Sequence, residues 1–103
     1  PPSTATADEI ARGRARYDER CALCHDAPGN AGGFFRRGLF PDLAYSPALA
    51  SAAAFDAIVL GGARAPNGMA SYAAVLEEGD SSAIRAFIIE RANAVLASRR
   101  SAQ

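Results

Sequence analysis

The chain of 103 residues contains no lysine and no tryptophan, and it has only one histidine and one methionine. Its eleven basic residues, all arginines, balance eleven acidic residues, so the formal net charge is zero. Nucleic-acid binding favours a basic surplus, and because none is present we expect no nucleic-acid partner. No apolar run reaches the roughly 18 residues that a membrane-spanning helix needs, so we expect no membrane span.

Large apolar side chains are also scarce. Half of the residues are hydrophobic, but 25 of the 103 are alanine, which buries little area. One domain is expected at this length, and a domain this small is stabilised only marginally by burial. Such domains usually need a covalent link or a cofactor to complete the core.

The only two cysteines and the only histidine form one run, Cys21-Ala22-Leu23-Cys24-His25. This spacing attaches c-type haem: two sulfurs on one turn reach the two vinyl groups of one porphyrin, and the imidazole is directed at the iron. A zinc site needs four ligands, and no further cysteine or histidine is available. A redox dithiol belongs in a βαβ pattern, which the sequence does not show. The run therefore predicts one covalent haem c per chain, with His25 as an iron ligand.

Met69 is the candidate for the second iron ligand. A lone methionine is usually a core residue, but an electron-transfer haem needs a second axial ligand and the chain offers no second histidine. Met69 lies in a loop rich in glycine and proline between two expected helices. The alternatives are a phenolate from Tyr45 or Tyr72, or an open iron position.

Helix signals recur along the chain. Thr6 and Glu9 form a capping-box pattern, and the arginines of the helix that follows are expected to face water. Residues 26–45 are expected to form a loop because glycine and proline are frequent there. Further helices are expected from Ser46-Pro47 to Gly61-Gly62, from Ser71 to Leu76, and from Asp80 onward, with Ser46, Ser71 and Asp80 as the caps.

This chain resembles class I cytochromes c over nearly its whole length. In that family the first helix carries a glycine, an aromatic residue four positions later and a haem cysteine four further on, as Gly13, Tyr17 and Cys21 do here. The last helix crosses the first at nearly a right angle through an aliphatic and an aromatic residue three apart, which Ile84 and Phe87 match. The resemblance implies an all-α class I cytochrome c fold, with about four helices wrapped around one haem c.

The resemblance also implies roles for Pro41 and Arg64. Pro41-Asp42-Leu43 matches a segment whose proline carbonyl accepts the second N–H of the iron-bound imidazole, which would orient His25. Read from the sequence alone, Pro41 is equally a turn proline. Arg64 would pair with a haem propionate or else be solvated. Ala70 stands where the family commonly has a proline. The apolar residues expected to wrap the haem are Tyr17, Leu43, Phe55, Ile58, Val75, Phe87 and Ile88.

Within the family, the chain most resembles the C-terminal cytochrome domain of quinohaemoprotein (PQQ-dependent) alcohol dehydrogenases. The residues that carry this likeness are Gly61-Gly62-Ala63-Arg64, Gly68-Met69 and the run from Ala86 to Asn93. Residues 1–6 read as a linker and residues 7–103 as the cytochrome domain, so we expect a mature form or an excised domain in the periplasm.

The expected function is one-electron transfer, with no catalytic residue in this chain itself. A redox protein or a fused PQQ dehydrogenase domain would donate electrons, and a cytochrome, copper protein, oxidase or quinone would accept them. The alternative is a haem enzyme or a gas-binding module with an open distal iron position, which requires that Met69 not bind the iron. A dithiol redox or metal-binding protein would require that Cys21 and Cys24 carry no haem.

Overall fold

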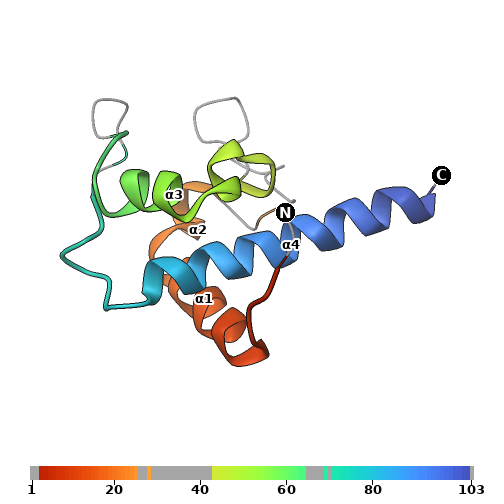
Figure 1. Ribbon diagram of the computed structural model, residues 1–103, viewed down its shortest axis with the longest axis horizontal. Helices are drawn as coiled ribbons and strands as arrows, with labels where there is room; N and C mark the ends of the chain where they lie inside the picture. The colour runs from red at the N-terminus through yellow and green to blue at the C-terminus, as the bar shows by residue number, and fades with distance from the viewer. Residues whose placement is uncertain (1–2, 26–27, 29–42, 65–68, 70, 103) are drawn as a thin grey trace.

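The structure, a computed structural model, describes residues 3–25, 28, 43–64, 69 and 71–102, without the side chains of residues 23, 24, 99, 100 and 102. Its elements are α1 (Ala7–Arg20), α2 (Ala22–His25), the 3-10 turns η1 (Leu43–Tyr45) and η2 (Pro47–Ala50), α3 (Ala52–Val59) and α4 (Asp80–Ala102). No strand occurs in this described part, which confirms the predicted all-α class. Helix α4 passes through the body of the molecule, and its last turns project beyond it (Figure 1).

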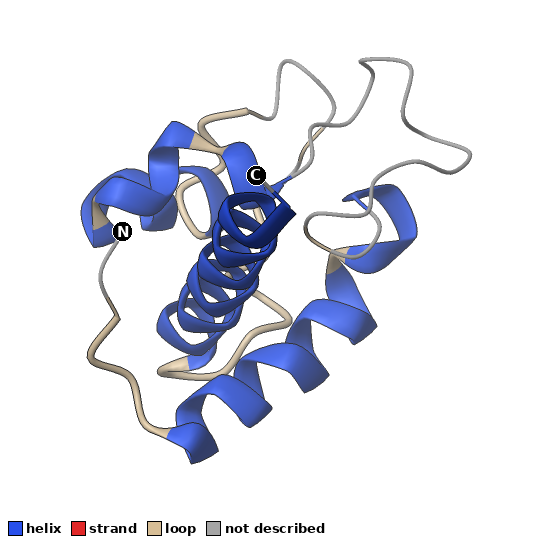
Figure 2. Ribbon diagram, turned by 90° about the vertical axis from the view of Figure 1, so that its right-hand side faces the viewer, coloured by secondary structure: helices blue, strands red, loops and turns tan. Residues whose placement is uncertain are grey.

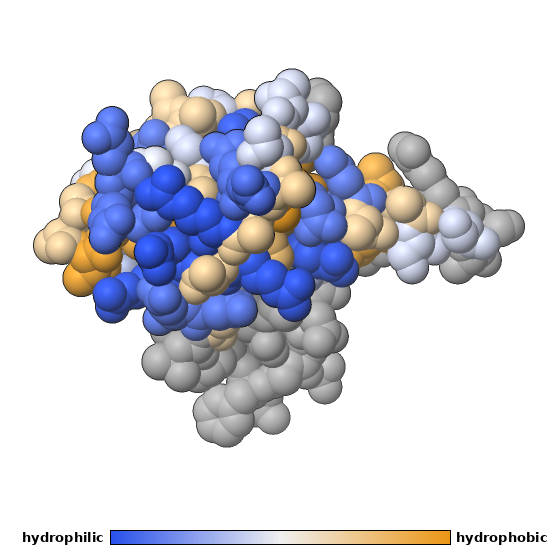
Figure 3. Space-filling view, turned by 90° about the horizontal axis from the view of Figure 1, so that it is seen from below, coloured by the Kyte–Doolittle hydropathy of each residue, from blue (hydrophilic) through white to orange (hydrophobic). Residues whose placement is uncertain are grey.

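Helix α1 begins where the capping pattern predicts. Thr6 is its N-cap, and the Thr6 Oγ1 accepts the Glu9 N–H at 3.1 Å. Asp8 and Glu9 add negative charge to the first turn, which the helix dipole favours. Gly13 and Tyr17 are buried one turn apart, whereas the surface of the molecule over α1 is mostly hydrophilic (Figure 3). The helix therefore has one buried face and one polar face.

The buried face of α1 packs directly on α4, as the sequence predicts. A Cβ atom at Gly13 would lie 1.7 Å from the Ala83 carbonyl oxygen and 3.0 Å from the Ile84 nitrogen. One turn further along α1, the Tyr17 and Phe87 ring centroids are 5.4 Å apart with the rings inclined at 57°. Figure 2 looks along α4 and shows α1 passing across it, with α3 on the opposite side. Glycine is thus required at position 13 because two backbones touch there.

Two arginines of α1 remain partly exposed to water, as expected, with 43% of the Arg12 side chain and 32% of the Arg16 side chain accessible, but both also reach Asp80, which was not expected. Arg12 donates from Nε to Asp80 Oδ1 at 2.8 Å and from Nη2 to the Glu78 carbonyl at 2.6 Å. Arg16 Nε lies 3.2 Å from Asp80 Oδ2. Asp80, predicted as an N-cap, is instead the first residue of α4, and its Oδ2 accepts the Glu77 N–H at 2.8 Å. The carboxylate ties α4 to α1 and to the preceding turn.

The charges around Asp80 shift two ionisation equilibria. Burial favours the neutral acid and opposes the shift, but the Glu77 N–H and the Arg12 and Arg16 guanidiniums hold the pKa of Asp80 below its ordinary value. The pKa of Arg16 is raised, first by Glu19 and then by Asp80. Both shifts favour the charged forms, so the cluster is ionised at neutral pH.

The helix predicted from Ser46 is interrupted at Ser51. Ser46 Oγ accepts the Ala48 N–H at 3.2 Å and caps only the short η2. Ser51 has an extended backbone, and its Oγ accepts the Ala54 N–H at 3.2 Å at the start of α3. A serine side chain that bonds a nearby backbone group offers the chain an alternative to helix. Two successive serine caps therefore divide the predicted helix.

The short helix predicted from Ser71 to Leu76 is also not formed. Residues 73–75 make a turn, and Val75 and Leu76 each donate their backbone N–H to the Tyr72 carbonyl at 3.1 Å. Gly79, with φ at +84°, then lets the chain reverse into α4.

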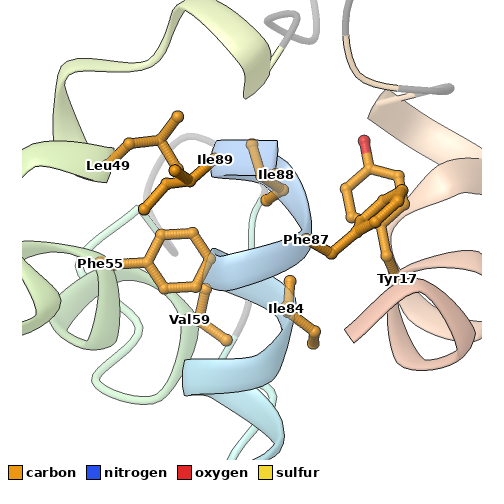
Figure 4. Close-up of a cluster of buried hydrophobic side chains, with 8 residues drawn as sticks. All are labelled: Tyr17, Leu49, Phe55, Val59, Ile84, Phe87, Ile88 and Ile89. Atoms are coloured by element: carbon orange, nitrogen blue, oxygen red, sulfur yellow. The ribbon is translucent and has the colours of Figure 1, made fainter. Parts of the chain in front are cut away.

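The core lies on both sides of α4. In Figure 4, Phe87 points toward Tyr17 of α1, whereas Ile89 points toward Leu49 and Phe55. Arg85 of α4 fastens η2 from outside this core, donating from Nε and Nη2 to the Leu49 carbonyl at 3.0 and 2.8 Å. The eight buried residues of the cluster are Tyr17, Leu49, Phe55, Val59, Ile84, Phe87, Ile88 and Ile89.

Candidate functional site

The cysteine–histidine run begins as a direct continuation of α1. The Cys21 N–H donates to the Tyr17 carbonyl at 2.8 Å, and the His25 N–H donates to the Cys21 carbonyl at 3.0 Å. Residues four apart on a helical turn lie on the same face, so Cys21 and His25 share one side of α2. Because Tyr17 is part of the α1–α4 crossing, this crossing sets the position of the run.

His25 is buried, with 8% of its surface exposed, although it is polar. Beside it, Cys21 and Ala22 are half-buried and pack against the hydrophobic cluster. The Cys24 backbone belongs to α2, and its side chain lies outside the described part of the structure. A thiol and an imidazole are therefore placed on one helical turn beside an apolar surface.

Met69 packs against the same hydrophobic cluster from a different part of the chain. It is half-buried, as are Leu43, Tyr72 and Leu76, which also pack there. The Met69 N–H donates to the Arg64 carbonyl at 3.1 Å. The structure thus brings the Met69 thioether and the Cys21 thiol to one apolar core from segments more than 40 residues apart in the sequence, with the buried His25 on the turn that follows Cys21.

The loop that carries Met69 is fastened to the end of α3. The Tyr72 N–H donates to the Val59 carbonyl at 2.7 Å, and the Ser71 hydroxyl donates to the Leu60 carbonyl at 2.6 Å. The last carbonyls of a helix lack partners within it, so residues 71 and 72 supply them. The sequence analysis predicted Ser71 as a helix cap and missed this role. The only visible sign of the role in the sequence is a serine two residues after the candidate ligand Met69.

The remaining predicted site residues are Pro41, Arg64 and the two alternative iron ligands, Tyr45 and Tyr72. Arg64 is exposed, and its backbone carbonyl holds Met69. Pro41 lies outside the described residues. Of the two tyrosines considered as ligands, Tyr72 is half-buried and Tyr45 is 53% exposed.

Of the residues expected to wrap the cofactor, Val75 is 47% exposed and does not line the core. The other six residues expected there are buried or half-buried. Leu49 and Ile89 belong to the core but were not predicted there.

The donor set fits a haem. Haem iron takes axial nitrogen and sulfur ligands from histidine and methionine, and the run supplies the thiols for covalent attachment. In the part of the chain that the structure describes, no three His, Cys, Asp or Glu side chains gather closely enough to hold a metal ion by themselves. His25 and Met69 would each provide one ligand, and Cys21 and Cys24 would provide the attachment.

Comparison with known proteins gives two matches. The family model described as cytochrome c oxidase, cbb3-type, subunit III, matches residues 8–88. The chain is 35% identical over 88 residues to the protein named 1-butanol dehydrogenase (cytochrome c) from Thauera butanivorans. That alignment covers 85% of this chain and 12% of the dehydrogenase, so the chain spans only a small part of its relative's length. No solved structure matches.

Among the residues that the structure describes, no helix combines the length and the apolar composition needed to cross a membrane.

Proposed function

The chain belongs to the cytochrome c family, and from this premise we propose that it is a one-electron carrier with one covalently attached haem c, ligated by His25 and Met69. The family model supports the predicted resemblance to cytochromes c, and the match to the 1-butanol dehydrogenase supports the resemblance to the cytochrome part of an alcohol dehydrogenase. The observation that carries the proposal is the packing of Cys21 and Met69 against one hydrophobic cluster, with His25 buried on the turn that follows Cys21.

The roles of the side chains follow from their chemistry. Each thiol, of Cys21 and of Cys24, would add across one vinyl group, forming an S–C bond while its hydrogen passes to the other vinyl carbon. His25 and Met69 would each supply one ligand to the iron. When bound, the haem supplies an iron that accepts and releases one electron. Ligation by methionine favours the reduced state more than ligation by a second histidine does.

The apolar surroundings would act in the same direction. A ferric haem carries one more positive charge than a ferrous haem, and burial among apolar side chains disfavours that charge. Tyr17, Phe87 and Ile88 are each at most 5% exposed and provide such surroundings. We also propose that the Pro41 carbonyl accepts the second His25 N–H, and that Arg64 pairs with a propionate.

The relative's name suggests the electron donor. Since the Thauera protein is named 1-butanol dehydrogenase (cytochrome c), we propose an alcohol dehydrogenase domain of the PQQ type as the donor, joined through residues 1–6 to a cytochrome domain of residues 7–103. A cytochrome, copper protein, oxidase or quinone would accept the electron. We further propose a periplasmic location, where haem of this kind is attached.

Acid–acetone extraction tests the covalent attachment. Haem should remain with the protein because thioethers survive the treatment. Replacing both cysteines, Cys21→Ala with Cys24→Ala, should release any haem that is still bound. Complete extraction from the wild type would contradict the proposal.

Carbon monoxide binding tests Met69. The ferric wild type should show the near-infrared charge-transfer band of methionine-ligated haem, and its ferrous form should bind carbon monoxide poorly. Met69→Ala should abolish the band, allow carbon monoxide to bind and lower the potential, since axial ligands are a main determinant of a potential range of about 0.8 V. Leu76→Ala is the control, because Leu76 packs on the same cluster without a donor atom. Fast, stoichiometric binding by the wild type without the band would favour the open-site haem instead.

A further inference from the structure

Three hydrogen bonds hold the segment around Met69: one lies within the loop between α3 and Met69, and two attach the segment to the end of α3. The Met69 N–H bonds the Arg64 carbonyl, the Ser71 hydroxyl bonds the Leu60 carbonyl, and the Tyr72 N–H bonds the Val59 carbonyl. Two of these bonds are between backbone groups and form with any side chain. The bond from Ser71 is the only one of the three that depends on a side chain.

Ser71 is bonded on both sides of its hydroxyl. Its Oγ donates to the Leu60 carbonyl at 2.6 Å and accepts the Ala73 N–H at 3.2 Å. It therefore links the carbonyl that follows α3 with the turn that follows Met69. Gly62 lies against the same residue: a Cβ on Gly62 would be 3.3 Å from the Ser71 Cβ, and Gly62 has a φ of +69°.

Between Met69 and Ser71 the sequence offers no equivalent restraint. Residue 70 is alanine, which leaves its φ angle free where a proline would fix it. Because Met69 and Ser71 are separated by this one residue, fixing Ser71 limits how far the Met69 sulfur can move.

We propose that Ser71 is a positioning residue that keeps Met69 on the iron by fastening its loop to Leu60. This inference rests on the proposed function, because it requires that Met69 is the axial ligand. Loss of the Ser71 hydroxyl makes displacement of the loop easier, so that an external ligand replaces Met69 more readily. A net hydrogen bond of ordinary strength corresponds to roughly a three- to tenfold change in that equilibrium.

The test compares three variants of the haem-loaded protein. Ferric wild type, Ser71→Ala, Ser71→Thr and Ser82→Ala are titrated with imidazole, and the loss of the methionine charge-transfer band is followed. Ser71→Ala should bind imidazole roughly three- to tenfold more tightly than the wild type. Ser71→Thr keeps the hydroxyl on an exposed side chain and should stay near the wild type. Ser82→Ala removes an exposed serine of α4 and should change nothing.

Amide hydrogen exchange gives a readout that does not depend on an added ligand. The Tyr72 and Ala73 N–H groups should exchange faster in Ser71→Ala than in the wild type, while amides at the α1–α4 crossing should be unchanged.

Two outcomes overturn different claims. If the wild type shows the band and Ser71→Ala binds imidazole as weakly as the wild type, Ser71 does not position Met69. This conclusion holds even if the melting temperature of Ser71→Ala is lower than that of the wild type. If the wild type lacks the band, the proposed ligation by Met69 is wrong and this inference falls with it.

Discussion

The residues at the crossing of α1 and α4 are almost inaccessible to solvent, whereas every described residue from Gly62 to Leu76 is exposed or half-buried. At the crossing, the backbones of α1 and α4 touch at Gly13. The Tyr17–Phe87 ring pair and the ion pairs of Asp80 also join the two helices there. The Met69 segment is fastened by hydrogen bonds to the end of α3. Packing holds the first region, and directional bonds to backbone carbonyls hold the second.

Because of this difference, we expect the crossing to determine folding stability and the Met69 segment to determine the redox properties of the iron. The histidine side of the proposed haem site continues from α1 and takes its position from the crossing, through the Cys21 N–H bond to Tyr17. The methionine side takes its position from a segment with little buried area, where small changes cost little folding energy. We therefore expect substitutions at the crossing to change stability and substitutions near Met69 to change iron ligation.

The largest expected effect is at Gly13. Gly13→Val would place a Cβ atom 1.7 Å from the Ala83 carbonyl oxygen, so α1 and α4 must move apart. Overpacking of this kind costs typically 1–3 kcal/mol and occasionally more, and because backbone atoms cannot rotate away, we expect a loss above about 3 kcal/mol. Thermal unfolding of Gly13→Val and of the wild type measures this loss of stability. Ala15→Val, on the exposed face of α1, is the control; equal stability of the two variants would contradict the crossing.

The second-largest expected effect is the contribution of Asp80 to folding stability, which depends on pH. Since its pKa is lowered from 3.8 in the folded protein, the folded state binds fewer protons than the unfolded state as pH falls below that value. The stability contributed by Asp80 is therefore present above about pH 4 and is lost as pH falls through the lowered pKa.

Asp80→Asn should lower the free energy of unfolding by about 2 kcal/mol at pH 7, because bonds to charged partners are lost. Denaturant unfolding at pH 7 and pH 3 measures the difference from the wild type, which should shrink at the lower pH. Asp18→Asn, at an exposed position of α1, should show no such convergence. A constant difference at both pH values would rule out the charged form as the source of the stability.

Local sequence signals predicted some of these features and not others. The resemblance to class I cytochromes c implied that Gly13 and Tyr17 cross Ile84 and Phe87, and the structure confirms that the two helices touch there. The capping pattern at Thr6 predicted the start of α1. The Arg12–Asp80 pair was not predictable, because the two residues are 68 positions apart in the sequence. An arginine is also common on the solvated face of a helix, and an aspartate is also common as a helix cap.

The break at Ser51 was missed for a related reason. Alanines on both sides favour helix, and only the hydrogen bond that the Ser51 Oγ accepts from the Ala54 N–H distinguishes a cap from a helical serine. At the candidate site, the run from Cys21 to His25 and the single methionine could be read directly. The bond that supports Met69 could not be assigned from the sequence: the serine two residues after the candidate ligand is visible, but its acceptor is the Leu60 carbonyl, a backbone group that every residue has.

The smallest effect, and the one that sharpens the comparison most, comes from a matched pair of glycines. Gly62 and Gly79 both have positive φ, +69° and +84°, so alanine at either position should cost roughly 1 kcal/mol of backbone strain. At Gly79 the new Cβ would meet the Arg12 guanidinium at 3.1 Å, the end of a flexible side chain, whereas at Gly62 it would lie 3.3 Å from the Ser71 Cβ. Denaturant unfolding should show similar losses of stability for Gly62→Ala and Gly79→Ala. Imidazole titration of the ferric proteins should separate them, since only Gly62→Ala presses on the residue that fastens the Met69 loop. Equal imidazole affinities would show that strain spreads through the whole domain, and that the two regions do not act separately.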